Sequence, residues 1–274
     1  MTVFEFGKNW QTFIDKYFNS QRLNNAIESL KNLLECDTFE NKTFIDIGCG
    51  SGLFSLAAYK LNAKKIVSLD RDEFSVEYCH KLFENYGKPE NWQIQTGSVL
   101  DDKFISKLEK FDIVYSWGVL QHTGNMWKAI DNAASLVKED GLLYIAIYNK
   151  IDDFGFFSDG RIGTSKLWLL EKKIYNFMPN FFKSIINLAS AGVLILMYLL
   201  TFNNPLKIIK EFKNKYRGMS WYVDIKDWLG GYPYEFASIE EIFLYLKKKK
   251  FILQNIKQKN NLGNNEFVLK KTKN

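Results

Sequence analysis

The sequence predicts an α/β fold, in which a parallel sheet carries helices on both faces and a mainly helical insertion. Short apolar runs alternate with helical patterns as far as Asn149, as in doubly wound sheets. A glycine-rich turn joins the first of these runs to the first following helix. A helix and two further strand-like runs resume the pattern after residue 235. The chain between these parts, residues 151–235, is therefore predicted to be an insertion.

Composition favours a folded protein in a reducing compartment. The chain has 274 residues, 46% of them hydrophobic, and 37 basic against 31 acidic side chains. This modest positive balance does not indicate nucleic-acid binding. Cys36, Cys49 and Cys79 show neither paired nor metal-ligand spacing, so no metal is expected. No signal peptide is recognised at the N-terminus, and we expect a cytoplasmic location.

Residues 1–40 are predicted to form two helices. Trp10 and Tyr17 belong to the first apolar face, and Leu23 and Leu30 belong to the second. These helices either pack on the sheet or place Trp10 over a bound ligand.

The glycine-rich turn is the first candidate ligand site. A short strand-like run ends in Asp46, Gly48, Gly50 and Gly52 follow at alternate positions, and a helix is expected from Leu53 to about Leu61. Glycines would let a ligand approach bare backbone N–H groups, and the helix N-terminus would favour an anionic group. A dinucleotide fingerprint would need its third glycine at position 53, which is Leu.

The spacing Asp46-x-Gly48-x-Gly50-x-Gly52 resembles the first motif of class I S-adenosylmethionine (SAM) dependent methyltransferases. The resemblance continues through Asp70, Gly97 to Asp101 and Phe111 to His122. It implies a Rossmann-like seven-stranded sheet, SAM as cofactor and S-adenosylhomocysteine as product. The cofactor-binding residues that it implies are Trp10, Asp46, Gly48, Cys49, Gly50, Gly52, Asp70, Arg71, Ser98, Val99, Trp117 and Gly118.

Asp70 ends the second predicted strand, where the resemblance implies a carboxylate on the ribose hydroxyls. Two carboxylate oxygens suit a vicinal diol, although a lone Asp here would more often cap a helix. Ser98 stands where an acidic residue often meets the adenine, which leaves Ser98, Asp101 and the N–H of Val99 as candidates.

His122 is the candidate general base. It follows the fourth predicted strand, Phe111 to Ser116, at the edge where open α/β sheets bind ligands. Imidazole titrates near neutrality and can take the proton of a hydroxyl acceptor. A structural hydrogen-bonding role is the alternative.

Ser116-Trp117-Gly118-Val119 differs from the tetrapeptide typical of amino-group methylases on DNA. Gly118 to Thr123 resembles methylases of quinones, other secondary metabolites and sugars. We therefore expect methylation of a small-molecule hydroxyl or carbon. A non-catalytic SAM-binding protein and an RNA methyltransferase are the alternatives.

The remaining elements are expected to complete one core around the insertion. Met126 to Val137 is predicted as a helix, Asp140-Gly141 as a turn, and Leu142 to Tyr148 as the fifth strand. Residues 1–150 would hold the SAM-binding core. Residues 236–274 would close it with the helix Ser238 to Lys249 and the strands Phe251 to Ile256 and Glu266 to Leu269.

Ser184 to Leu206 contains no charged residue and is long enough to cross a bilayer. A single crossing is rejected, because the chain after residue 238 is needed to complete the sheet. The stretch either packs inside the insertion or between subunits, or it lies on the inner face of a membrane, where basic flanks favour anionic lipid.

Aromatic residues crowd the end of the insertion, between Trp221 and Tyr234, in a stretch that is expected to form a loop. Aromatic walls with a few polar groups suit a small-molecule site. The predicted substrate-binding residues are Tyr148, Trp228, Tyr232 and Tyr234, and a lipid-like or glycan acceptor is considered.

Overall fold

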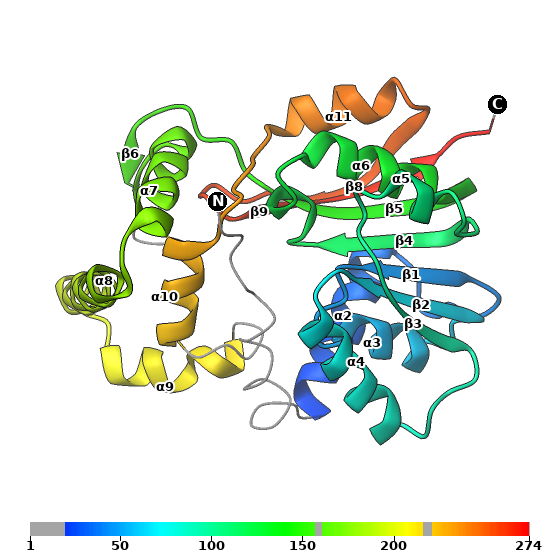
Figure 1. The fold of residues 1–274 in the computed structure, drawn as a ribbon, viewed down its shortest axis with the longest axis horizontal. Helices are drawn as coiled ribbons and strands as arrows, with labels where there is room; N and C mark the ends of the chain where they lie inside the picture. Colours follow the sequence, from blue (N-terminus) through cyan, green and yellow to red (C-terminus); the bar gives the residue numbers. More distant parts are fainter. Residues whose placement is uncertain (1–19, 157–160, 216–220, 274) are drawn as a thin grey trace.

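The structure is a computed structural model that describes residues 20–156, 161–215 and 221–273. Seven strands form one sheet in the order β3-β2-β1-β4-β5-β9-β8 (Figure 1). Their bounds are β1 Thr43–Ile47, β2 Lys65–Asp70, β3 Trp92–Thr96, β4 Phe111–Trp117, β5 Val137–Tyr148, β8 Phe251–Lys257 and β9 Asn264–Lys271. The predicted α/β class and seven-stranded sheet are confirmed.

Strands β1 to β5 are parallel, and β9 runs antiparallel between β5 and β8. The strand order turns back between β1 and β4, since β2 and β3 lie on one side and β5 on the other. Ligands of open α/β sheets bind beyond the carboxyl ends of the strands at such a point.

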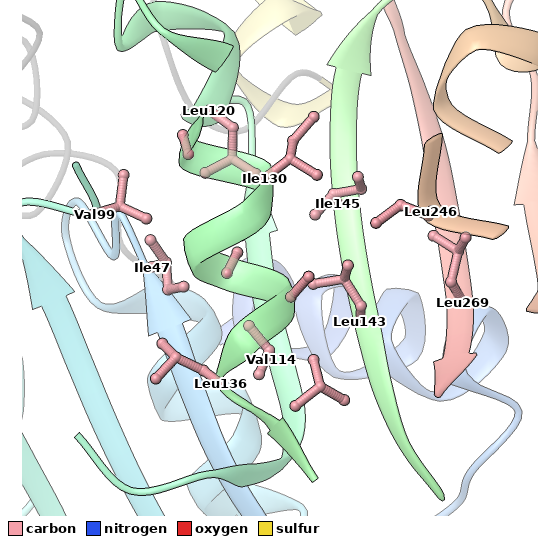
Figure 2. Close-up of a cluster of buried hydrophobic side chains, with 14 of the residues drawn as sticks. Ile47, Val99, Val114, Leu120, Ile130, Leu136, Leu143, Ile145, Leu246 and Leu269 are labelled. Atoms are coloured by element: carbon pink, nitrogen blue, oxygen red, sulfur yellow. The ribbon is translucent and has the colours of Figure 1, made fainter. Parts of the chain in front are cut away.

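Helices cover both faces of the sheet. On one face lie α2 Ser20–Leu34, α3 Leu53–Lys60 and α4 Glu73–Asn85. On the other lie α5 Asp102–Ile105, α6 Met126–Ser135 and α11 Ile239–Lys247. Figure 2 shows Ile130 of α6 and Leu246 of α11 facing Leu143, Ile145 and Leu269 of the sheet. After the insertion, helix α11 packs on the sheet, and strands β8 and β9 form its last two strands.

The insertion leaves the sheet after β5 and returns at α11. It contains the short strands β6 Gly155–Phe156 and β7 Ile162–Gly163, and the helices α7 Ser165–Phe177, α8 Asn180–Leu200, α9 Pro205–Lys215 and α10 Trp221–Gly230. Figure 1 shows it beside the carboxyl ends of β4 and β5, with α10 between α8 and the sheet. It therefore borders the edge where the predicted site lies.

Two expectations about local structure need correction, and the bounds of the apolar helix are now defined. Asp140-Gly141 lies inside β5, because the register with β4 slips from Phe111↔Val137 to Ile113↔Leu142 and takes up the turn as a bulge. The aromatic stretch from Trp221 is helical as far as Gly230, since Trp221, Ile225 and Leu229 bury one helical face. The apolar helix begins after Pro179 and ends at Leu200, earlier than the charge-free stretch.

Candidate active site

The glycine-rich turn folds tightly between β2 and the loop after β4. Gly48, Gly50 and Gly52 have positive φ angles of 75°, 52° and 81°. A Cβ on Gly48 would lie 2.3 Å from Cγ2 of Val119, and one on Gly52 would lie 2.7 Å from Sγ of Cys79. These two glycines are needed because neighbouring side chains approach the backbone.

The backbone donors of this turn are used within the protein. The N–H groups of Gly48 and Cys49 both donate to the Leu69 carbonyl, at 2.7 and 3.1 Å. Gly50 donates to Oδ2 of Asp70 at 3.0 Å, and Gly52 donates to the Cys49 carbonyl at 2.9 Å. The expectation that a ligand meets bare N–H groups is therefore wrong for these four residues, because the turn packs back on β2.

Asp46 is buried under the turn and held by a chain of donors. Trp92 Nε1 donates to Ser68 Oγ, Ser68 to Ser55 Oγ, and Ser55 to Oδ2 of Asp46, at 2.8, 2.6 and 2.8 Å. Burial raises the pKa of the Asp46 carboxyl to about 7, against the Ser55 hydrogen bond and with the help of the Asp70 charge. The position and rotamer of Asp46 are thus fixed.

Asp70 ends β2 beside the turn. Its Oδ1 accepts the Asp72 N–H at 3.0 Å, while Oδ2 accepts the Gly50 N–H. Burial raises the pKa of this carboxyl, and the two backbone donors oppose the shift. Arg71 follows with an exposed side chain. Since each carboxylate oxygen has two acceptor positions, Asp70 keeps capacity for a vicinal diol.

The third strand leads to the predicted adenine side. Ser98 Oγ accepts the Leu100 N–H at 3.2 Å, and the Val99 side chain is buried in the core. Asp101 caps α5 by accepting the N–H groups of Lys103 and Phe104. The cap occupies Asp101, so Ser98 and the Val99 backbone remain the predicted contacts.

The loop after β4 forms the other side of the candidate cofactor site. Trp117 and Gly118 are half-buried at the end of β4, and the Gly118 N–H donates to the Ala146 carbonyl at 3.4 Å. Ser116 Oγ donates to the Ile47 carbonyl at 3.0 Å, which ties this loop to the end of β1. Trp10 lies outside the described residues.

His122 has a defined tautomer. Its Nδ1 lies 2.6 Å from the Pro233 carbonyl, which can only accept, so Nδ1 carries the proton. Nε2 lies 3.3 Å from the Tyr148 hydroxyl and accepts from it. Burial lowers the pKa of His122 to about 4; the Pro233 hydrogen bond opposes this and the Lys172 charge adds to it. The ring is therefore neutral at pH 7.

Aromatic side chains from β5 and the insertion meet beside His122. The Tyr148 ring centroid lies 5.3 Å from that of His122, 4.9 Å from Tyr234 and 5.8 Å from Trp228. Tyr232 is half-buried in the same segment as Tyr234. The structure thus gathers Tyr148, Trp228 and Tyr234, which the sequence predicts for the acceptor.

The returning chain fastens this arrangement. The Glu235 N–H donates to the Gln121 carbonyl at 3.0 Å, and the Ala237 N–H donates to the Tyr148 carbonyl at 3.1 Å. The Glu235 carboxylate accepts the Met126 N–H at the start of α6. The residues next to Pro233 therefore fix both His122 and Tyr148.

Comparison with known proteins now identifies the family. A family model described as "Methyltransferase domain" matches residues 38–215. The chain belongs to this methyltransferase family. It is 32% identical over 111 residues to a ribosomal protein L11 methyltransferase of Macrococcus caseolyticus, and 29% identical over 112 residues to a ubiquinone biosynthesis O-methyltransferase of Chelativorans sp..

These alignments cover 40% and 41% of this chain, and the chain spans only 33% and 42% of the two relatives. Among solved structures, magnesium protoporphyrin IX methyltransferase of Synechocystis is similar with a TM-score of 0.55 and 13% identity, covering 97% of this chain and 94% of that one. A putative SAM-dependent methyltransferase of Methanococcus maripaludis has a TM-score of 0.51 and 18% identity, covering 100% and 98%. Likenesses at this identity support the fold.

The methyltransferase's turn suits its cofactor, SAM. Burial raises the pKa of the carboxyl groups of both Asp46 and Asp70, and no lysine or arginine in the described ranges pairs with either one. Two carboxylates without a basic partner fit a ligand that carries positive charge and hydroxyl groups. Asp70 would bind the ribose hydroxyls, and the buried Asp46 would lie beneath the turn that holds the cofactor. When bound, SAM supplies an electrophilic methyl group on its sulfonium.

Lys172 of the methyltransferase is a site residue that the sequence did not reveal. Its side chain is 1% exposed, and Nζ lies 5.1, 5.3 and 5.9 Å from the ring centroids of Tyr234, Trp228 and Trp168. Burial lowers the pKa of Lys172 to about 7; Glu171 opposes this shift, and Arg161 adds to it. A buried amine that is about half protonated at pH 7 thus lies behind the aromatic wall, and its charged form lowers the pKa of His122.

Lys172 shares one helical face with Trp168, Glu171 and Tyr175. Trp168 Nε1 and Oε2 of Glu171 are buried without a hydrogen-bond partner in the described part of the chain. The sequence signal for a buried Lys172 is this helical spacing, which places Glu171 and Lys172 on the same face as Trp168 and Tyr175. The sequence alone gave no reason to prefer it over a solvated face.

Proposed function

We propose that this methyltransferase transfers the methyl group of SAM to a hydroxyl of a small molecule with an apolar or aromatic body. The observation that carries the proposal is the His122–Tyr148 pair, which lies at the carboxyl edge beside Trp228 and Tyr234. Aromatic walls favour an apolar body, and the pair favours an O–H group. Similarity to a ubiquinone biosynthesis O-methyltransferase also supports this acceptor class.

The proton of the acceptor hydroxyl passes to the Tyr148 oxygen while the Tyr148 proton passes to Nε2 of His122. Tyr148 is unchanged in net terms, and His122 becomes an imidazolium whose Nδ1–H still donates to Pro233. Because the pKa of His122 is about 4, it holds a proton poorly before methyl transfer. The proton therefore moves together with the methyl group, and not in an earlier step.

Placement supports this order of events. Alignment of acceptor oxygen, methyl carbon and sulfur accounts for much of the rate in such displacements. The half-buried His122 and Tyr148 are fixed by the backbone bonds around Pro233, and the insertion covers them on one side. Rigid placement and exclusion of water are therefore this chain's main contributions.

The test measures S-adenosylhomocysteine formed from SAM with a panel of catechols and long-chain quinols. Turnover that falls strongly in the Tyr148→Phe variant, with unchanged SAM affinity, supports the proposal. SAM binding without turnover on the panel or on cell extract would favour a non-catalytic SAM-binding protein. Methylation of the protein or RNA fraction of that extract would favour a macromolecular acceptor. Of these two fractions, protein is the more relevant, because the chain is similar to a ribosomal protein L11 methyltransferase.

A further inference from the structure

Helix α8 presents an unusual surface because its apolar side chains face outward. Its inner face is anchored to the insertion: the Tyr175 hydroxyl donates to Asn187 Oδ1 at 2.9 Å, and Trp221 Nε1 donates to the Tyr198 hydroxyl at 3.2 Å. Ala191 is buried between these two contacts. The opposite face therefore cannot turn inward without breaking them.

That outward face is almost wholly apolar. In the described ranges α8 is the one helix long and apolar enough to span a bilayer, yet only 11% of its apolar stretch is buried. Leu188 is 64% exposed and Phe202, just beyond the helix, is 99% exposed. The outer face, which we call the α8 face, consists of Phe181, Ile185, Leu188, Val193, Leu196 and Leu199. An apolar surface of this extent marks an interaction site.

The apolar surface continues past the start of α8. A surface hollow of about 650 Å³ lies at the α7–α8 corner, between Ile174, Phe177, Met178 and Phe182. Lys173 borders the hollow with an exposed side chain. The hollow is thus apolar within and positively charged at its edge, as suits an acyl chain below an anionic headgroup.

Charge around the α8 face has one sign. Residues 172–210 contain lysines but no aspartate or glutamate. Lys173, Lys207 and Lys210 have exposed side chains. Basic side chains beside an apolar helical face are typical of helices that lie in the interface of an anionic membrane.

We propose that this chain docks on an anionic lipid bilayer through the α8 face, with α8 lying in the plane of the interface. A crossing helix is incompatible with the contacts of α8 to Tyr175 and Trp221 on the same side of the membrane. A second copy is the poorer partner, because a two-fold contact would bring the lysines of both copies together, and residues 172–210 contain no acid to pair them. The proposal does not depend on methyl transfer.

The test is flotation of the full chain with phosphatidylcholine vesicles, with and without phosphatidylglycerol. We expect binding to the anionic vesicles, weakened by salt because the lysines contribute through charge. Replacing both Leu188 and Leu196 by Glu should lower binding by about tenfold or more. The matched control replaces Leu244 and Ile252, two exposed apolar residues of the core domain, by Glu and should leave binding intact.

A second variant separates charge from apolar contact. Lys207→Glu with Lys210→Glu should lower binding to anionic vesicles by about tenfold and leave binding to neutral vesicles unchanged. Size-exclusion chromatography with light scattering completes the test. Failure to bind anionic vesicles overturns the proposal, as does equal loss of binding in the Leu244/Ile252 control. A dimer that the Leu188/Leu196 variant dissociates, without vesicle binding, would assign the α8 face to a second copy.

Discussion

The Nε2 atom of His122 lies 3.3 Å from the hydroxyl oxygen of Tyr148, and Nδ1 of the same ring donates to the Pro233 carbonyl. One ring thus links the loop after β4, the end of β5 and the end of the insertion. In the proposed reaction, Tyr148 meets the acceptor hydroxyl and His122 receives the proton.

Tyr148→Phe and His122→Ala should each lower kcat by about 100-fold, because each removes one half of the proton path. The double variant should lose little more than either single variant, since residues acting as a unit are not additive. SAM dissociation constants measured by calorimetry should stay within about twofold. His80→Ala, on the exposed side of α4, is the matched control. Additive losses would mean that the two residues act separately.

His122 should stay neutral far below pH 6.5. The chain has two histidines, so NMR titration of the His80→Ala variant reports His122 alone. Its pKa should be about 4. The unfolded chain takes up this proton near pH 6.5 while the folded chain does not, so the free energy of unfolding attributable to His122 falls as pH drops from 6.5 towards 4. A midpoint near 6.5 would contradict the buried, hydrogen-bonded ring.

Lys172→Met should change the pH dependence of stability between about pH 7 and 10.5. The Lys172 pKa is about 7 in the fold and 10.5 in the unfolded chain, so the unfolded state holds the extra proton in this window. The titration of Lys172 therefore makes the free energy of unfolding rise with pH in this window, and the Lys172→Met variant should lose that rise.

The same variant should raise the pKa of His122, because it removes a nearby positive charge. Urea unfolding at several pH values measures the change in stability, and NMR titration measures the pKa of His122. Lys173→Met, at the exposed neighbouring residue, is the control for both measurements. Parallel stability curves for Lys172→Met and the parent would show that the ammonium is not buried in solution.

Asp70→Asn should weaken SAM binding by about 10- to 100-fold, as expected for hydrogen bonds to a charged acceptor worth roughly 1.5–3 kcal/mol. The fold should survive, because Asn keeps an acceptor for a backbone donor and the buried charge is removed. Calorimetry measures the affinity and thermal unfolding checks the fold. The exposed Asp37→Asn is the control. Unchanged affinity at Asp70 would remove it from the cofactor site.

The sequence predicted the sheet, and the residues that gather at its carboxyl edge, for a local reason. Glycines at alternate positions after a short strand, with Asp70 at the end of the next strand, reflect constraints between near neighbours. Parallel pairing then brings these strand ends to one edge. His122, Tyr148 and Tyr234 could be predicted as site residues because each follows or faces that edge.

Contacts between distant segments could not be predicted in the same way. The N–H groups of the turn are taken by Leu69 and Asp70, which the glycine pattern does not reveal. In the sequence, Lys172 and Lys173 together look like a basic flank. On helix α7, however, these neighbouring residues point in different directions, so that the Lys172 side chain is buried and the Lys173 side chain is exposed. Only the packing of α7 against α10 decides which lysine is inside.

Incubation of the full chain with methyl-labelled SAM and a detergent-solubilised cell extract tests whether a small hydroxyl compound is the acceptor. The label is then measured in the small-molecule, protein and RNA fractions. We expect label on a small hydroxyl compound in the organic-soluble fraction, formed in equal amount with S-adenosylhomocysteine and lost in the Tyr148→Phe variant. Label confined to protein or RNA, or label transfer that Tyr148→Phe leaves unchanged, would contradict it.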